Sequence, residues 1–185
     1  MCTEIEAKLK VDSLQQVERK LAELGARFLA EQLQTDYHFD DADDNFAKTD
    51  RCLRLRRQTD GKNEGFFLTY KGAKEKSRFK KRQEIEAEVK DADSVRKLFS
   101  ALGYKKTVVV EKKRRVWQFA GCEIALDRLP LLGDFVEIEG PDEEKIAAVQ
   151  KDLGLSDLPH IPKSYAALTK AKLRELGKKQ KGVSL

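Results

Sequence analysis

Charged and apolar residues alternate at the start of the chain, in the stretch Glu4-Ile5-Glu6-Ala7-Lys8. Successive side chains of a β-strand point to opposite faces, so a strand here places two carboxylates and an ammonium group on one face. Carboxylate oxygens suit Mg²⁺ or Mn²⁺, which makes this face a candidate site for a metal and an anion. Taken alone, the stretch also fits an ordinary solvent-exposed strand face.

The triplet Glu-Ile-Glu occurs at residues 4–6, 84–86 and 137–139. Each copy leads into apolar residues at helical spacing and then a glycine, which is a signal for the end of a helix. The sequence therefore predicts three strand-then-helix units. Because the copies are irregularly spaced, we interpret them as pseudo-symmetry within one domain and not as a solenoid.

The same alternation recurs along the rest of the chain and predicts about eight strands and three or four helices, an α+β fold. The acidic segment 40–50 lacks the glycine and terminal glutamate of an EF-hand loop, so we interpret it as a solvated loop. A last helix is expected at about 163–176. The predicted strands cover residues 3–11, 35–39, 51–58, 66–71, 80–89, 107–119, 122–129 and 135–139.

Nearly every predicted strand has one charged face, and eight strands can close into a barrel with a usable interior. If the apolar faces point outward and helices cover them, the barrel becomes a tunnel with a polar interior. The alternative is an open sheet whose charged face is wet, but alternation over so many strands favours the tunnel. The side chains expected inside are Glu4, Glu6, Lys8, Arg54, Arg56, Lys71, Arg82, Glu84, Glu86, Lys112, Arg114, Asp127, Glu137 and Glu139.

So many charges can be buried only if they are paired, hydrated or matched by a charged ligand. Acidic and basic residues are present in comparable numbers, which suits a polyphosphate with bound metal. The planar fork of arginine can bind two phosphate oxygens at once. The pattern therefore favours a site for a metal-bound polyphosphate.

Composition agrees with one globular domain that binds an anion. The chain has 185 residues, 37% of them charged, and a formal net charge of +5. We expect residues 1–176 to form the domain and residues 177–185 a basic tail. No apolar run approaches the ~20 residues that span a bilayer. The N-terminus leaves no room for a signal peptide, and the three cysteines lack metal-ligand spacing, so we expect reduced thiols in a cytoplasmic protein.

Taken together in this order, these motifs resemble the CYTH domain family, the triphosphate tunnel metalloenzymes. The resemblance covers residues 3 to about 170 and is strongest to the class IV adenylyl cyclase group. It depends on the Glu4-x-Glu6-x-Lys8 signature and on a set of later motifs that follow in the family's order. Those motifs are Arg54-x-Arg56, Thr69-x-Lys71, Arg82-x-Glu84-x-Glu86, Lys112-x-Arg114, Asp127, the run 133–139 and Lys163-Ser164-Tyr165.

The resemblance implies a closed eight-stranded antiparallel tunnel that binds a nucleoside or inorganic triphosphate with Mg²⁺ or Mn²⁺. It assigns Glu84 and Glu86 to a possible second metal or to positioning water. It also implies that the catalytic residues are Glu4, Glu6, Lys8, Asp127 and Glu137. The implied metal ligands are Glu4, Glu6, Glu137 and Glu139, and the implied phosphate-binding residues are Lys8, Arg54, Arg56, Lys71, Arg82, Lys112, Arg114 and Lys163.

Three functions are compatible with these residues. A cyclase would convert ATP to cyclic AMP and pyrophosphate, and the resemblance favours this reaction. An inorganic or thiamine triphosphatase would release orthophosphate. A non-catalytic module would bind polyphosphate or RNA, but few aromatic residues are interleaved with the basic ones, so nucleic acid is not the expected partner. We expect no membrane partner, and a monomer or a homodimer. His38 and His160 are isolated and are expected on the surface or in local packing.

Overall fold

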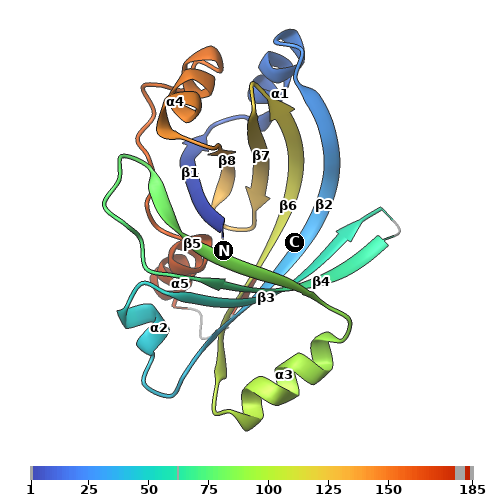
Figure 1. Cartoon of the computed structure of the whole chain (residues 1–185), viewed down its shortest axis with the longest axis vertical. Coiled ribbons are helices and arrows are strands. Elements are labelled where there is room, and N and C mark those ends of the chain that lie inside the picture. The colour runs from blue at the N-terminus through green and yellow to red at the C-terminus, as the bar shows by residue number, and fades with distance from the viewer. Residues whose placement is uncertain (1, 62, 178–181, 184–185) are drawn as a thin grey trace.

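The computed structural model describes residues 2–61, 63–177 and 182–183. Eight strands follow each other in the order β2-β3-β4-β5-β1-β8-β7-β6, and β6 pairs back with β2, so the sheet closes into an antiparallel barrel (Figure 1). This confirms the expected fold. The strands are β1 (Cys2–Val11), β2 (Arg27–Asp40), β3 (Cys52–Asp60), β4 (Asn63–Lys71), β5 (Lys80–Val89), β6 (Lys105–Phe119), β7 (Cys122–Leu129) and β8 (Gly133–Glu139).

Pairing between strands places opposite charges directly across from each other on the inner face. Glu4 of β1 lies opposite Arg82 of β5, and Lys8 of β1 lies opposite Glu137 of β8. Side chains at directly opposed positions are close enough to interact, and opposite charges there are stabilising. The alternation in the sequence therefore becomes a set of charge pairs across the barrel wall.

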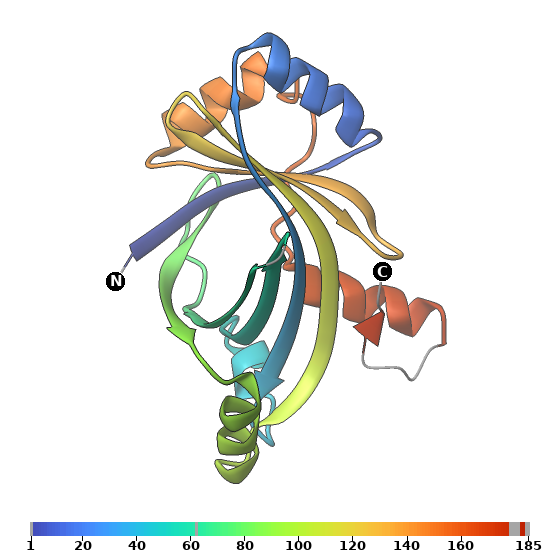
Figure 2. The ribbon, with the colours of Figure 1, turned by 90° about the vertical axis from the view of Figure 1, so that its right-hand side faces the viewer.

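The outer face carries apolar clusters, and helices cover them at both ends of the barrel (Figures 1 and 2). Helices α1 (Leu14–Glu23) and α4 (Glu143–Asp152) pack their apolar faces on β1, β7 and β8 at one end. At the other end α3 (Ala92–Ala101) packs on β2, β3 and β4. Helix α5 (Tyr165–Glu175) lies against β6 and β8. The apolar side chains therefore pack between the barrel and the helices, and the interior of the barrel is lined mainly by charged side chains.

The three Glu-Ile-Glu strands are each followed by a helix, as the repeats predicted. Ser13 is the N-cap of α1, and its hydroxyl accepts a hydrogen bond from the backbone N–H of Gln16. Gly25 and Gly103 follow the ends of α1 and α3 with φ of 72° and 84°, a conformation that glycine adopts without steric cost. The glycine signals in the sequence therefore mark real helix ends.

The segment before residue 52 differs from the sequence-based expectation. β2 has 14 residues instead of five, because it pairs with β6 along its whole length and with β3 over its second half. The segment 40–50 is not wholly solvated: Asp40 is buried, and its carboxylate accepts hydrogen bonds from the backbone N–H groups of Phe46 and Ala47. These bonds hold the short helix α2 (Asn45–Lys48) against the barrel.

Part of the expected basic tail, residues 178–181 and 184–185, lies outside the described residues. The dipeptide between them, β9 (Gly182–Val183), runs parallel to β6 beside Val109 and Val110. Within the described ranges, no helix has the length and apolar character needed to cross a membrane.

Gly140, which connects β8 to α4, is packed too closely to carry a side chain. A Cβ atom here would lie 2.8 Å from Cys122 Sγ and 2.9 Å from Ile146 Cγ1, both fully buried. We expect Gly140→Ala to lower the free energy of unfolding by about 1–3 kcal/mol in urea denaturation, the usual cost of overpacking. Gly72→Ala is the matched control, because its Cβ would meet nothing closer than 3.6 Å. Equal stability of the two variants would contradict this account of the packing.

Candidate functional site

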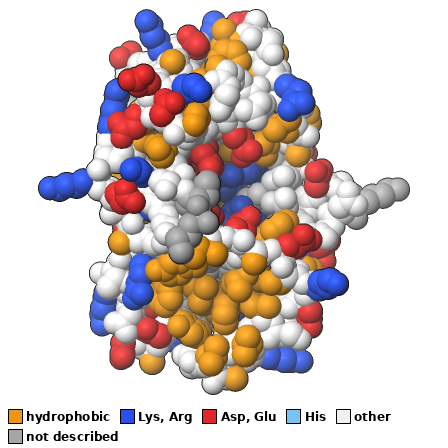
Figure 3. Space-filling view, in the orientation of Figure 1, with side chains coloured by type: hydrophobic (Ala, Val, Ile, Leu, Met, Phe, Trp, Pro, Cys, Tyr) orange, Lys and Arg blue, Asp and Glu red, His pale blue; other side chains and the backbone are white. Residues whose placement is uncertain are grey.

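The barrel encloses a cavity of about 810 Å³ that opens on the face shown in Figure 3, where acidic and basic side chains meet in a hollow. Eight carboxylates and eight Lys or Arg side chains line it. The acidic set is Glu4, Glu6, Asp36, Glu84, Glu86, Glu123, Glu137 and Glu139, and the basic set is Lys8, Arg54, Arg56, Lys71, Lys80, Arg82, Lys112 and Arg114.

Thirteen of the fourteen side chains that the sequence places inside the barrel line this cavity. The fourteenth, Asp127, is fully buried behind Lys112 and Arg114. The side chain of Lys163 is exposed and does not line the cavity, although its backbone oxygen accepts a hydrogen bond from Lys8 Nζ at 3.3 Å. A role for the Lys163 ammonium group in binding phosphate therefore stays a prediction.

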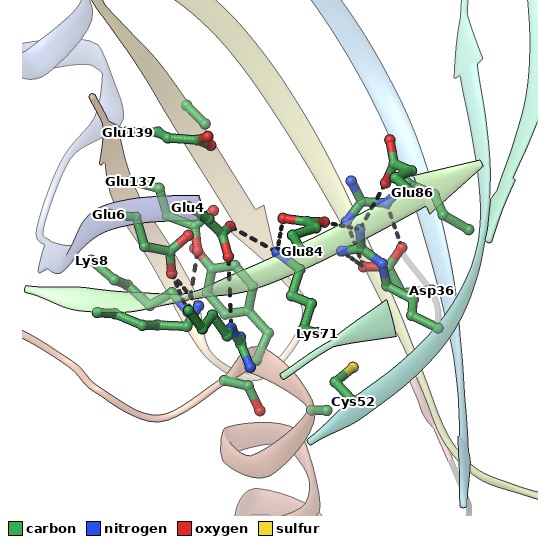
Figure 4. A pocket seen from close by; sticks show the side chains of 18 of the residues that line it. Glu4, Glu6, Lys8, Asp36, Cys52, Lys71, Glu84, Glu86, Glu137 and Glu139 are labelled. Atoms are coloured by element: carbon green, nitrogen blue, oxygen red, sulfur yellow. Dashed lines mark hydrogen bonds and ion pairs between the residues drawn. The ribbon is translucent and has the colours of Figure 1, made fainter. Parts of the chain in front are cut away.

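One group of charges lies where β1, β4 and β5 meet (Figure 4). Lys71 Nζ bridges two carboxylates, at 2.7 Å from Glu4 Oε1 and 2.9 Å from Glu84 Oε2. Arg82 Nε lies 3.6 Å from Glu4 Oε2, which is beyond hydrogen-bond distance. Lys80 pairs with Glu6. Lys80 was not among the predicted site residues. It lies two positions before Arg82 in the same alternating pattern, and this pattern indicated that both side chains point to the same face of the strand.

A second group is formed by β1, β6, β7 and β8. The Arg114 guanidinium binds both carboxylate oxygens of Asp127, at 2.7 and 2.5 Å, and also contacts Glu137. Lys8 Nζ lies 3.1 Å from Glu137 Oε1. Burial alone would raise the pKa of Glu137, but Lys8 and Arg114 outweigh it and hold this pKa well below its usual range. Burial and the neighbouring Arg114 lower the pKa of Lys112 to about 7. A change in its surroundings, such as a bound anion, can therefore change the charge of Lys112 near neutral pH.

A third group contains Asp36, which the sequence analysis missed. Arg56 Nε and Nη2 lie 2.6 and 2.8 Å from the two carboxylate oxygens of Asp36, and Arg54 Nη1 lies 3.7 Å from Asp36 Oδ2. A signal was present, because polar residues alternate along β2 at positions 32, 34, 36, 38 and 40. His38, expected on the surface or in local packing, also lines the cavity, with Nδ1 3.4 Å from Cys52 Sγ. Burial lowers the pKa of His38 to about 4, so its ring is neutral at pH 7.

The carboxylates near the end of β8 have the character of a cation site. Glu4 Oε2 is buried and has no hydrogen-bond partner. Burial and the carboxylates of Glu4 and Glu6 raise the pKa of Glu139 to about 7, and no ion pair within the described ranges involves Glu139. Carboxylate oxygens that lie close together, one of them without a hydrogen-bond partner, suit Mg²⁺ or Mn²⁺.

The side chains of Glu4, Glu6 and Glu139 are not arranged as a metal site in this structure. In the part of the chain that the structure describes, no three Asp, Glu, His or Cys side chains converge on one point suitable for a metal ion. Glu4 is held by Lys71 and Glu6 by Lys80, so both would have to turn from these partners to bind a cation. The residues fit a hard divalent cation by their chemistry, and binding it requires these two ion pairs to rearrange.

The geometry agrees with the comparison to protein families, in which the CYTH domain matches residues 3–165. The chain belongs to the CYTH family.

The chain is also similar to individual proteins along nearly its whole length. A Methanocaldococcus jannaschii protein named "Putative adenylate cyclase MJ0240" is 33% identical over 174 residues, which cover 89% of this chain and 97% of the relative. The solved structure of PH1819 from Pyrococcus horikoshii is 30% identical, with a TM-score of 0.80 over 91% of this chain and 99% of that one. HpAC1 from Hippeastrum, described as a "putative adenylyl cyclase" with "a dominant triphophatase activity", is 19% identical and shares the fold, with a TM-score of 0.67 over 96% of this chain and 97% of that one.

The Asp36–Arg56 pair makes a pH-dependent contribution to stability. Burial alone would raise the pKa of Asp36, but Arg56 and Arg54 outweigh it and hold this pKa far below its usual range. A carboxyl group with a lowered pKa stabilises the fold above its unfolded pKa of ~3.9 and loses that effect as the pH falls further. We expect Asp36→Asn to lower the free energy of unfolding by about 3 kcal/mol at pH 7, because it leaves a buried guanidinium without its partner.

The difference between Asp36→Asn and the unchanged protein should shrink below about pH 4, because Asp36 then takes up a proton in the unfolded chain while it stays charged in the folded protein. Urea denaturation at a series of pH values measures it. Asp152→Asn, at an exposed position of α4, is the control and should differ from the unchanged protein by less than about 0.5 kcal/mol. A constant difference from pH 7 to pH 3 would show that Asp36 is not held in its charged form by the two arginines.

Proposed function

We propose that this protein is a metal-dependent enzyme that acts on a triphosphate held in the barrel cavity. The observation that carries the proposal is the wall of the cavity, in which eight cationic side chains are matched by eight carboxylates. A triphosphate without metal would add several negative charges to a wall that is already balanced. A triphosphate bound to divalent cations adds little net charge, and it offers oxygens to the basic residues and cations to the carboxylates.

The basic residues act by holding and orienting the phosphates. Arg54, Arg56 and Arg114 present planar groups that can bind two oxygens at once, and Lys8, Lys71 and Lys112 supply further donors. Each of these six already contacts a carboxylate, so none is an unpaired buried cation before phosphate binds. The wall is therefore preorganised for an oxyanion, which is the main requirement of phosphoryl transfer.

The carboxylates divide into two sets. Glu4, Glu6, Glu137 and Glu139 would hold Mg²⁺ or Mn²⁺, which when bound polarises phosphate oxygens and opposes the charge that develops on them. Glu84 and Glu86 contact Lys71 and Arg54 instead, which supports a role in orienting these two cations. Asp127 does the same for Lys112 and Arg114 from behind the wall. Arg82 lies beside Glu4 in the cavity wall, and its buried Nε has no hydrogen-bond partner, so it is a further candidate to contact phosphate.

Hydrolysis that releases orthophosphate is the reaction this lining supports best. Cyclisation of ATP needs a place that orients the nucleoside, and aromatic rings are a usual platform for a base. Among the described lining residues, the rings belong to His38, which contacts Cys52, and to Tyr165, which has two ammonium groups over it. Triphosphatase activity in HpAC1 indicates that a protein of this fold can support hydrolysis. Adenylyl cyclase activity is the second candidate, and the name of the M. jannaschii relative favours it.

Product analysis tests the proposal. The protein is incubated with Mg²⁺ or Mn²⁺ and, separately, with inorganic triphosphate, ATP and thiamine triphosphate. We expect orthophosphate, fastest from inorganic triphosphate, and no release in the presence of a chelator. Cyclic AMP with pyrophosphate would make the second candidate the correct one. No product from any substrate across metals and pH would contradict an enzymatic role and leave a polyphosphate-binding module.

A variant at Glu6 tests whether turnover depends on the proposed metal-binding carboxylates. Glu6→Gln removes one charged oxygen ligand, so we expect turnover to fall roughly 100-fold or more. Glu31→Gln, at an exposed position of β2 outside the cavity lining, is the control and should keep full activity. Circular dichroism checks that both variants are folded. Normal turnover by folded Glu6→Gln would remove Glu6 from the metal site.

A further inference from the structure

The ring of Tyr165 is fixed at one side of the cavity. Tyr165 is the first residue of α5, and the hydroxyl of the N-cap Ser164 accepts a hydrogen bond from the backbone N–H of Ala167 at 3.2 Å. The ring packs edge-on against Phe135 of β8, with 5.2 Å between ring centroids, and Tyr165 lines the cavity. Its position is therefore set by both the helix start and the barrel wall.

Two ammonium groups lie over this ring. Lys8 Nζ is 4.0 Å and Lys112 Nζ 5.0 Å from the ring centroid, within the distance at which an aromatic face attracts a cation. Both lysines are almost fully buried, with 3% and 2% of their surface exposed. A buried ammonium group needs such compensation, because it has lost its hydration.

The carboxylates around these lysines are shared with a third cation. Lys112 contacts Asp127, but both oxygens of Asp127 also receive hydrogen bonds from Arg114. Lys8 contacts Glu137, which Arg114 contacts as well. Glu6 lies 3.9 Å from Lys8 Nζ but is itself paired with Lys80, so the three basic groups here share mainly two carboxylates.

The Tyr165 ring can stabilise these buried ammonium groups without adding a negative charge to the cavity, which another carboxylate could not do. A third carboxylate would neutralise the extra cation but would repel an incoming phosphate. The face of a tyrosine ring attracts an ammonium group through its quadrupole and carries no net charge. The cations can therefore be held in place and remain able to attract an anion.

We propose that Tyr165 is a positioning residue whose ring holds the ammonium groups of Lys8 and Lys112 at the wall of the cavity, ready to receive phosphate oxygens. This inference rests on the proposed function, since it assumes that the ligand is a triphosphate. It assigns no contact between Tyr165 and the substrate. The ring, and not the hydroxyl, is the part that acts.

Three variants separate the ring from the hydroxyl and from general packing. Tyr165→Phe keeps the aromatic face, and Tyr165→Leu removes it but keeps an apolar side chain. Tyr104→Leu makes the same change in the apolar cluster under α3, away from the cavity. For inorganic triphosphate with Mg²⁺, we expect KM to rise roughly tenfold in Tyr165→Leu, with a smaller change in kcat, and to stay within about twofold in the other two variants.

Equal KM values for folded Tyr165→Leu and the unchanged protein would overturn the proposal. So would a KM for Tyr165→Phe as high as that for Tyr165→Leu, because the hydroxyl would then be the important group. Thermal unfolding of each variant shows whether it is folded.

A second measurement does not depend on activity. In the free protein, NMR should show the terminal methylene protons of Lys8 and Lys112 shifted upfield by the ring, with the shift retained in Tyr165→Phe and lost in Tyr165→Leu. Absence of this shift in the unchanged protein would overturn the positioning role even if the enzyme is active. If the shift is present but no triphosphate is turned over or bound, the positioning of the lysines stands and the proposed function fails.

Discussion

The pairing of opposite charges across the inner wall of the barrel is the interaction on which the rest of the structure depends. Closing eight strands creates an inner face that must be filled, and here it is filled with charged side chains around a hollow. Unpaired, each of these charges would cost several kcal/mol to bury. Strand register prevents that cost by placing Glu4 opposite Arg82 and Lys8 opposite Glu137. The hydrophobic effect then acts outside the barrel, where helices α1, α3, α4 and α5 cover the apolar faces.

This arrangement links stability to function. Buried ion pairs contribute little net stability, since desolvation offsets most of their attraction. Their value here is that each cation already has an oxygen partner that holds it in place before a phosphate binds. The most buried cations are oriented from behind, Arg114 and Lys112 by Asp127, and Arg56 by Asp36. Glu139 is the exception, because it takes part in no ion pair among the described residues and lies close to the carboxylates of Glu4 and Glu6, an environment that suits a divalent cation.

The sequence predicted the fold and most of the cavity wall because both depend on a period-two pattern that is visible locally. Alternation identified thirteen of the side chains that line the cavity, and glycines after apolar helical stretches located the ends of the first helices. The full length of β2 was missed because it depends on pairing with β6, some 75 residues away, which no local pattern shows. Asp36 was missed although polar residues alternate around it, because only a short part of this strand was predicted from the sequence. The cation–π contacts of Tyr165 could not be predicted either, since they require α5 to meet β1 and β6 in space. Lys163 shows the opposite case, in which a motif is present but the Lys163 side chain is exposed and does not line the cavity.

The central claim is that a balanced cavity binds triphosphate and divalent cation together. Titration calorimetry of the unchanged protein with inorganic triphosphate, in Ca²⁺, in Mg²⁺ and in a chelator, tests it most directly, and the orthophosphate released during each titration is measured so that heat from turnover can be subtracted. The account predicts that the cations tighten triphosphate binding at least roughly tenfold, and that triphosphate tightens cation binding by the same factor, as linkage requires. Triphosphate that binds equally well or more tightly in chelator would contradict the account, because the wall would then be an anion site whose carboxylates take no part.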